Sequence, residues 1–344
     1  MKIYFVVKEP SERTVNHYVE SLGMALEEQG CEVVYGLQRL WTAEVQECDI
    51  VHFQWPEFIF KTCTEADVSR MKNRLEWLRV HGIRIFCTCH NLKPHTKGDD
   101  TIMDLYDVLY NHADTIVHLG QYGCELLRPH YPNACHVVVP HHIYDNVLTF
   151  AVSQQEARRR LSLPEGKPVV LCFGKFRNNG ERQFVLMLKR NLNEALFLTP
   201  GFYRETLHTW NPKKFVTRLY HTLRYKWKGI QFSNEVIPDD LMQCYYCAAD
   251  VVLIQRLDIL NSGNLPMAFA AGRVVVGPDV GNVGQILRET GNFTFNPQRA
   301  ESAVEAVQEA LKTSSKGEEN KVYAAKHWSS EMTAKKMLEY YETN

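Results

Sequence analysis

Two loops in the second half of the chain carry residue types that bind phosphate. The first follows an apolar run and combines a glycine with arginines, whose planar guanidinium groups form paired, charge-assisted bonds to phosphate oxygens. The second precedes a short helical stretch, where free backbone N–H groups and the helix dipole attract anions. Each loop alone is more often a tight turn, but two such loops at strand ends favour a diphosphate site. The candidate residues are Gly174, Arg177, Arg182, Ser262, Gly263 and Asn264.

Histidines mark the ends of apolar runs in the first half. They are His52, His90, His118 and the pair His141-His142. A single histidine is more often structural, but the carboxyl ends of parallel strands share one edge, so the group predicts an active-site edge. Imidazoles titrate near neutrality and suit proton transfer or hydroxyl recognition. His90 and His118 are the catalytic candidates. No pair has a helical ligand spacing and acidic partners are sparse, so no metal site is predicted.

The segment 203–228 is basic and rich in aromatic residues. It holds seven Lys or Arg residues and one acid, Glu205. A solvated helix covering the second domain is the favoured interpretation. Peripheral contact with an anionic membrane surface is the alternative. Nucleic-acid binding is not expected, because the whole chain has a net charge of -1.

Strand-length apolar runs alternate with helical patterns throughout the chain. The predicted strands are 2–7, 32–35, 50–53, 84–89, 115–118 and 136–139, and then 169–173, 195–198, 230–232, 251–254, 274–277 and 293–295. This alternation predicts an α/β protein with parallel sheets. We expect two doubly wound Rossmann-like domains that face each other across a cleft, at 1–150 and 151–327, followed by a C-terminal helix at 328–344 that returns to the first domain.

Composition supports an ordinary globular protein. The chain has 344 residues, of which 45% are hydrophobic. Its ten cysteines are scattered and many lie in apolar runs, which is typical of reduced thiols in a cytosolic protein. No run approaches the ~20 apolar residues that span a bilayer. A cytoplasmic protein is therefore expected, with possible attachment to the inner face of a membrane through 203–228.

At the level of motifs, the chain resembles a GT-B-fold glycosyltransferase, similar to the family-four sugar-nucleotide enzymes of bacterial polysaccharide assembly and to a mannosyltransferase-like subset of them. The segments that carry the resemblance are Ala249-Asp250-Val251, Gly263 to Ala270, Gly272 to Gly281, Phe173-Gly174-x-Phe-Arg177, His90-Asn91 with Pro94-His95, and Trp328 with the final helix. The family carries two glutamates spaced E-x7-E in its donor-binding block. Asn261 and Phe269 occupy those positions here.

The resemblance implies sugar transfer from a nucleoside-diphosphate sugar to a hydroxyl of a saccharide or lipid-linked acceptor, without a metal or any other cofactor. It further implies that backbone near Ile237 contacts the nucleobase. Two alternatives stay open. A sugar-nucleotide epimerase of the same fold would need several acids and bases around the sugar, and few acids lie at these strand ends. A non-catalytic partner in a polysaccharide assembly complex would explain the missing glutamates.

Overall fold

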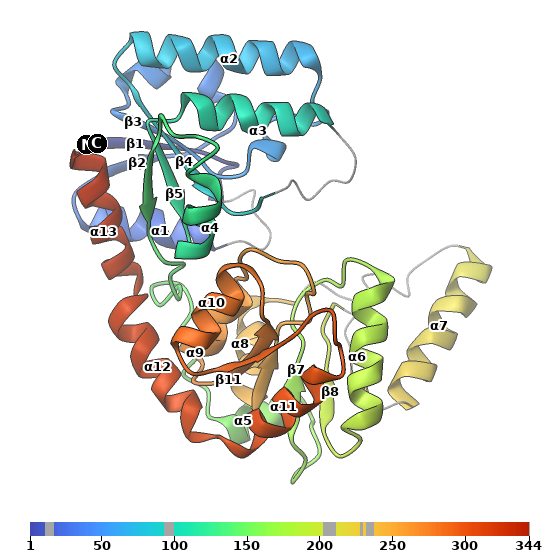
Figure 1. Ribbon diagram of the computed structural model, residues 1–344. Helices are drawn as coiled ribbons and strands as arrows, with labels where there is room; N and C mark the ends of the chain where they lie inside the picture. Colours follow the sequence, from blue (N-terminus) through green and yellow to red (C-terminus); the bar gives the residue numbers. More distant parts are fainter. Residues whose placement is uncertain (11–16, 93–99, 202–210, 228–229, 232–236, 344) are drawn as a thin grey trace. The chain divides into compact units, whose positions relative to one another are not determined.

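The computed structural model describes residues 1–10, 17–92, 100–201, 211–227, 230–231 and 237–343. The chain divides into two compact units (Figure 1). Unit 1 comprises Met1–Val147 and His327–Asn344, and unit 2 comprises Leu148–Lys326. Each unit is built on its own six-stranded sheet.

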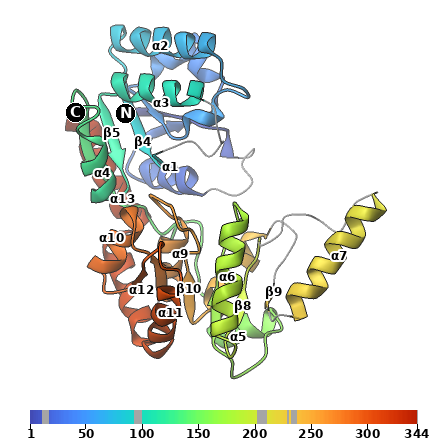
Figure 2. The same cartoon turned by 45° about the vertical axis from the view of Figure 1, so that its right-hand side comes forward.

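Unit 1 is a parallel sheet with the strand order β2-β1-β3-β4-β5-β6. Its strands are β1 (Lys2–Val6), β2 (Glu32–Val34), β3 (Ile50–Phe53), β4 (Arg84–Cys89), β5 (Thr115–His118) and β6 (Cys135–Val138). Its helices are α1 (Tyr18–Glu28), α2 (Glu65–Val80), α3 (Asp100–His112), α4 (Gln121–Leu127) and α13 (Ser330–Thr343), with short 3₁₀ turns at Arg39–Trp41, Ala43–Glu47 and Pro56–Phe58. The helices α2 and α3 pack together, and so do α1 and α13 (Figure 2).

The C-terminal helix α13 is an integral part of unit 1. Tyr341 is fully buried, and its hydroxyl is hydrogen-bonded to His52 Nδ1 at 2.5 Å. The Tyr341 ring also packs edge-on against Phe86, with 4.9 Å between the ring centroids. The other His52 nitrogen, Nε2, is hydrogen-bonded to Thr88 Oγ1 at 2.8 Å. This histidine therefore fastens the last helix to β3 and β4.

Unit 2 is a second parallel sheet, with the strand order β12-β11-β10-β7-β8-β9. Its strands are β7 (Val169–Leu171), β8 (Leu196–Leu198), β9 (Ile230–Gln231), β10 (Val251–Leu253), β11 (Val274–Pro278) and β12 (Phe293–Phe295). Its helices are α5 (Gln154–Arg160), α6 (Asn179–Asn191), α7 (Pro212–Trp227), α8 (Asp239–Ala248), α9 (Asn264–Ala270), α10 (Gly281–Glu289), α11 (Ser302–Lys312) and α12 (Ser315–His327). The predicted doubly wound α/β class is confirmed for both sheets.

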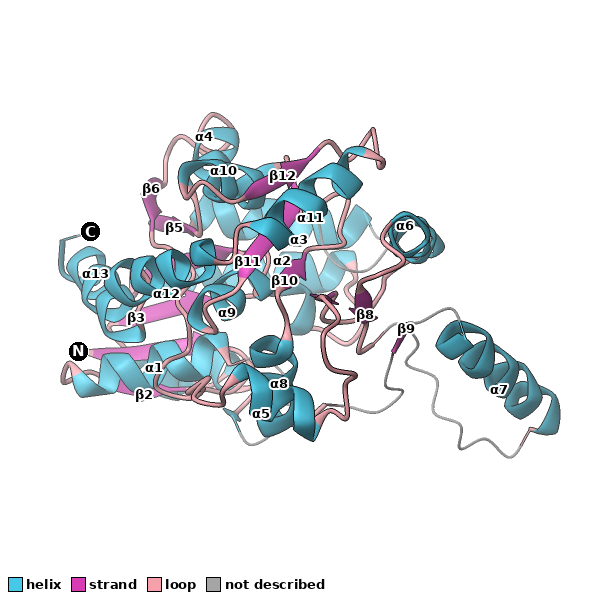
Figure 3. Ribbon diagram, turned by 90° about the horizontal axis from the view of Figure 1, so that it is seen from below, coloured by secondary structure: helices cyan, strands magenta, loops and turns pink. Residues whose placement is uncertain are grey.

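One core cluster lies between the sheet of unit 2 and the helices α6 and α11. It includes Phe184 from α6, Val307 from α11 and Phe295 from β12. The rings of Phe184 and Phe295 lie 5.2 Å apart. Helix α7 instead lies outside the β9 edge of this sheet (Figure 3).

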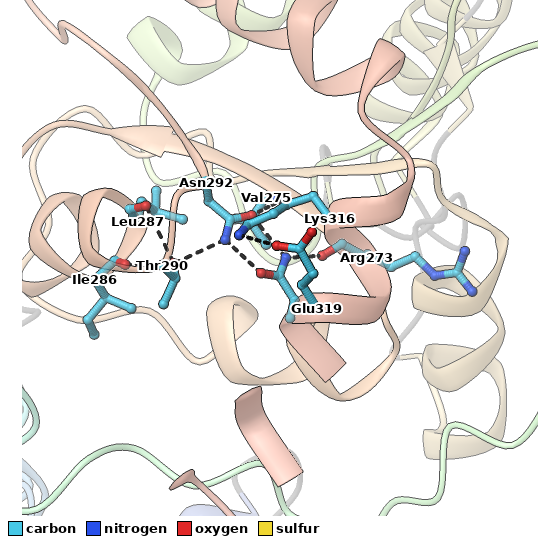
Figure 4. Close-up of polar contacts among 9 residues, drawn as sticks. Arg273, Val275, Ile286, Leu287, Thr290, Asn292, Lys316 and Glu319 are labelled. Carbon is cyan, nitrogen blue, oxygen red and sulfur yellow. Dashed lines mark hydrogen bonds and ion pairs between the residues drawn. The ribbon is translucent and has the colours of Figure 1, made fainter. Parts of the chain in front are cut away.

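A pair of buried amides helps to attach α12 to unit 2 (Figure 4). Asn292 Nδ2 donates to Asn320 Oδ1 at 2.7 Å, and Asn320 Nδ2 donates back to Asn292 Oδ1 at 2.9 Å and to the Arg273 carbonyl at 2.8 Å. Asn292 Oδ1 also accepts from the Val275 N–H at 3.1 Å. Asn320 is 1% exposed, so this reciprocal pair satisfies polar groups that water does not reach.

Candidate functional site

The two loops predicted to bind phosphate lie side by side in unit 2. Strands β7 and β10 are paired neighbours, with Val170 opposite Val251. From β7 the chain builds the sheet outward through β8 and β9, and from β10 it builds the sheet in the other direction. This junction is the topological switch point, where open α/β sheets bind ligands beyond the carboxyl ends of their strands.

Asn264 joins the two loops directly. Its side-chain Nδ2 donates to the Phe173 carbonyl at 2.9 Å, and its Oδ1 accepts from the Tyr246 hydroxyl at 2.9 Å. Its backbone N–H donates to Ser262 Oγ at 3.3 Å. The side chain predicted to meet a ligand therefore also holds the loop after β10 against the loop after β7.

An arginine that the sequence analysis did not select holds the loop after β7 in place. Arg256 donates from Nη1 to both Glu181 carboxylate oxygens, at 2.8 and 2.7 Å, and from Nη2 to the Lys175 carbonyl at 2.6 Å. The same carboxylate accepts from the Arg177 backbone N–H at 2.8 Å. The side chains of Arg256 and Glu181 are 14% and 5% exposed. This buried ion pair ties both loops and the first turn of α6 together.

Arg177 presents a second cation close to this ion pair. Its side chain reaches solvent, yet the pKa of its guanidinium is lowered, first because surrounding protein removes part of its water and then because Arg256 carries a like charge nearby. The Glu181 carboxylate and Asp258 offset part of this destabilisation. Arg182 lies half-buried in the first turn of α6.

The glycine of the first loop adopts a conformation that other residues avoid. Gly174 has φ +94, and a Cβ added there would meet no atom within 4 Å. Its carbonyl lies so close to Gly201 that a Cβ on Gly201 would approach the Gly174 oxygen to 2.8 Å. The loop backbone is therefore open where a Gly174 side chain would be, and its carbonyl side packs closely against Gly201.

Gly263 precedes α9 as its N-cap, with φ -63, and Ser262 lies half-buried before it. Ile237 is half-buried just ahead of α8, and the neighbouring Val236 lies outside the described residues. Phe269, which occupies the place of the family's second glutamate, is fully buried in α9. The Phe269 ring therefore does not reach solvent, and this position provides no carboxylate.

In unit 1, His90 is held within an aromatic cluster. Its Nε2 is hydrogen-bonded to Gln54 Oε1 at 2.8 Å, and its ring stacks on Trp55 with 4.1 Å between centroids. The edge of the Tyr18 ring meets it at 4.9 Å. These residues follow the carboxyl ends of β3 and β4, beside the switch point between β1 and β3. Pro94 and His95, named with His90 in the sequence analysis, lie outside the described part of the chain.

The same tyrosine brings the His141-His142 pair into the His90 cluster. The ring centroids of His141 and His142 lie 5.0 and 4.9 Å from that of Tyr18. Burial lowers the pKa of His141 to about 4 and that of His142 well below its ordinary value. Both rings are therefore neutral at physiological pH.

The remaining predicted histidines lie elsewhere. His52 anchors α13, as described above, and burial lowers its pKa to about 3. His118 is 1% exposed and its Nε2 is hydrogen-bonded to His136 Nδ1 at 2.9 Å. Burial, with smaller contributions from His136 and Arg128, lowers the pKa of His118 to about 3. The structure thus gathers His90, His141 and His142 and gives His52 and His118 separate partners.

The structure describes residues 211–227 of the basic segment, which are Asn211 and helix α7. Residues 203–210 and residue 228 lie outside the described part of the chain. Apolar side chains on α7 are exposed, among them Val216 at 63%, Tyr220 at 58% and Leu223 at 59%. Lys213 and Lys214 are exposed on its first turn. Among the described helices, none is long and apolar enough to cross a membrane.

Comparison with known proteins relates the chain to others through its fold. No family model matches the sequence, and no curated protein matches it either. Solved structures do match over essentially the whole chain. The sucrose-phosphate synthase of Thermosynechococcus elongatus is 16% identical, with 99% of this chain and 98% of that chain covered and a TM-score of 0.75.

Two further matches were solved with ligands. The catalytic domain of starch synthase IV from Arabidopsis thaliana, bound to ADP and acarbose, is 11% identical at a TM-score of 0.70, covering 99% of this chain and 98% of that one. Anabaena HepE in complex with UDP-glucose is 11% identical at a TM-score of 0.70, with both chains covered in full (100%). The two six-stranded parallel units of this chain thus have the fold of GT-B glycosyltransferases.

Proposed function

We propose that this protein is a glycosyltransferase that moves a sugar from a nucleoside-diphosphate sugar to a hydroxyl of a saccharide or lipid-linked acceptor. The observation that carries the proposal is the pair of loops at the β7–β10 switch point, joined by Asn264 and by the Glu181–Arg256 ion pair. Support also comes from the matched structures, one solved with UDP-glucose and another with ADP and acarbose.

In the proposed reaction, the bond between the sugar and the diphosphate breaks and negative charge develops on the departing phosphate. Arg177, Arg182 and the backbone N–H groups from Ser262 to Asn264 stabilise this charge in place of a divalent metal. Glu181 and Arg256 act as positioning residues, because they hold the loop that carries Arg177. Gly174 leaves room for the phosphate to approach the backbone, and backbone at Ile237 contacts the nucleobase.

On the acceptor side, we assign His90 to contact with the sugar or the acceptor hydroxyl. Gln54 and Trp55 fix the orientation of its ring through the hydrogen bond and the stacking contact. A ring held in one orientation loses little conformational entropy when it binds a substrate. His118, the second catalytic candidate from the sequence, has no such support, because its hydrogen-bonded nitrogen is engaged with His136 inside the unit.

The decisive experiment is a thermal-shift panel with UDP, GDP, ADP and CMP. A ligand of the native state present at 100 times its Kd adds about 2.7 kcal/mol to the free energy of unfolding, so one nucleoside diphosphate should raise Tm clearly. Arg177→Ala should abolish that shift, whereas Arg190→Ala, an exposed arginine at the far end of α6, should leave it unchanged. If no nucleotide raises Tm, a non-catalytic partner replaces the enzyme as the better explanation.

Product analysis then separates transfer from epimerisation. Incubation with the nucleotide sugar that binds, without an acceptor, should leave the sugar's configuration unchanged. An isomer formed under those conditions would identify a sugar-nucleotide epimerase instead.

For the lipid-linked form of the acceptor, we propose peripheral contact through α7 at the inner face of a membrane. Exposed apolar side chains such as Val216 and Leu223 can enter the boundary between headgroups and acyl chains, while Lys213 and Lys214 attract anionic headgroups. Sedimentation with anionic vesicles should be lost in Val216→Ser/Leu223→Ser and retained in Val80→Ser, an exposed valine on α2. Equal sedimentation of both variants would exclude α7 as the contact.

A further inference from the structure

A second cluster of titratable side chains lies in unit 1 on the strand next to β4, and the proposed transfer does not use it. His118 ends β5, His136 lies in β6 and Cys124 lies in α4. Among the described residues, one potential ligand atom from each of these three side chains lies within 4.8 Å of the others. His118 and Cys124 are buried, and His136 is half-buried.

The hydrogen bonds fix which nitrogen of His136 can act as a ligand. Its Nε2 lies 2.9 Å from the Tyr131 carbonyl, which can only accept, so Nε2 carries the proton. Nδ1 then presents its lone pair toward His118 Nε2, at 2.9 Å. A histidine that donates one N–H to a carbonyl and directs the other nitrogen at a shared point has the usual geometry of a metal ligand.

Hydrogen bonding between the two rings alone does not satisfy the cluster. His118 is 1% exposed, yet no partner is found for its Nδ1 among the residues that the structure describes. The nitrogen that faces His136 is Nε2, so an ion held between the two rings would bind His118 through Nε2 and leave the ring proton on Nδ1.

The third potential ligand is the sulfur of Cys124. Cys124 is fully buried, and Arg128 Nη2 donates to its Sγ at 3.3 Å. This N–H can remain hydrogen-bonded to the thiolate that is left when a metal displaces the thiol proton into solvent.

We propose that His118, Cys124 and His136 bind a zinc ion. Zn²⁺ takes imidazole nitrogens and thiolates in tetrahedral sites, and a site with three protein ligands leaves its fourth position to water. Metal–nitrogen distances of about 2.0–2.1 Å and a metal–sulfur distance of about 2.3 Å place the ligand atoms roughly 3.3–3.6 Å apart at tetrahedral angles. Side-chain shifts of about 1 Å bring the three atoms to those separations. This assignment removes His118 from substrate contact.

Cobalt substitution tests the ligand set directly. Metal-free full-length protein titrated with Co²⁺ should develop thiolate-to-cobalt charge-transfer absorption that saturates at one ion per chain. Zn²⁺ should then remove the absorption, because it binds such sites more tightly than Co²⁺. Absence of the charge-transfer band would overturn the proposal.

Matched variants assign the ligands. Cys124→Ser should eliminate the charge-transfer band, and Cys135→Ser, which alters an exposed cysteine beside His136, should retain it. His136→Gln should weaken metal binding at least tenfold, while His130→Gln, an exposed histidine on the segment after α4, should not. A band that survives Cys124→Ser, or disappears equally in Cys135→Ser, would contradict the assignment.

X-ray absorption at the zinc edge of the wild-type protein provides a measurement that no folding defect can obscure. Its first coordination shell should contain two nitrogens and one sulfur, with the remaining scatterer an oxygen. A shell without sulfur would overturn the site even if the protein binds zinc. Neither outcome depends on transferase activity, so the result stands apart from the proposed function.

Discussion

The Glu181–Arg256 ion pair is the contact on which the geometry of the proposed phosphate site depends. Replacing Arg256 with alanine removes two hydrogen bonds to the carboxylate and one to the Lys175 carbonyl. It leaves Glu181, which is 4% exposed, with a buried charge and only the Arg177 N–H among these contacts. Breaking one side of such a buried pair costs about 3–5 kcal/mol. We expect a loss of that size in the free energy of unfolding of unit 2.

A double-mutant cycle isolates the pair from the individual side chains. Glu181→Gln keeps an acceptor for Arg177 but leaves the Arg256 guanidinium without its counter-charge. The double variant should therefore lose less stability than the two single variants summed, with a coupling energy of about 2 kcal/mol. Arg256→Lys should fall between wild type and Arg256→Ala, since an ammonium cannot form the bidentate contact.

Urea unfolding, with hydrogen exchange of α6 as the local reporter, measures these differences. Calorimetric titration with the nucleotide that binds should show a Kd raised at least tenfold in Arg256→Ala, equivalent to about 1.4 kcal/mol. The exposed pair Lys312–Glu309 on α11 serves as control, with an expected coupling below about 0.5 kcal/mol. A Glu181–Arg256 coupling equally small, with Kd unchanged, would refute the idea that this pair holds the loop.

Three further predictions test other parts of the molecule. His52 has its pKa lowered to about 3 by burial, so below about pH 6.5 the unfolded chain binds the extra proton and stability falls as pH falls. Between about pH 7 and pH 5 this linkage lowers the free energy of unfolding by about 2 kcal/mol. In urea titrations, the free energy of unfolding of His52→Gln should therefore depend less steeply on pH than that of the wild type; identical slopes would contradict this. Asn320→Ala breaks the pair with Asn292 and the bond to the Arg273 carbonyl, and should lower the free energy of unfolding by about 1–3 kcal/mol with faster exchange in α12; a change below about 0.5 kcal/mol would count against the amide pair. His90→Gln should slow transfer at least tenfold while the nucleotide Kd changes less than twofold, and a weakened Kd with normal turnover would place His90 on the donor instead.

The strands could be predicted from the sequence because both sheets are buried on two faces. Runs such as Val169–Leu171 and Val251–Leu253 are apolar without alternation, as parallel strands are. The position of the two candidate phosphate-binding loops at one edge of the sheet was also predictable, since a parallel sheet brings the ends of its strands to one edge. Their adjacency follows from the pairing of β7 with β10, which a strand count alone does not specify.

Side-chain partners were harder to predict, because they depend on where loops turn. Arg256 occurs in a polar loop, and its sequence neighbours do not distinguish a buried ion pair from a solvated arginine. His118 and His136 are 18 residues apart and meet only because β5 and β6 pair in one particular register. The sequence placed His90 at the end of a strand, but its stacking on Trp55 depends on the path of the chain after β3.

The way α12 is attached affects how it would detach. Its buried residues are Gly317, Asn320 and Ala324, and a Cβ on Gly317 would come within 2.3 Å of the Gly272 carbonyl. These side chains are small or polar, and the Tyr323 ring of α12 also meets the buried Phe269 ring with 6.4 Å between centroids, so local opening of α12 uncovers some apolar surface. The sensitivity of an opening reaction to denaturant scales with the surface it exposes. Amide exchange in α12 should therefore accelerate less with sub-denaturing urea than exchange in α11, which buries Val307 in the core.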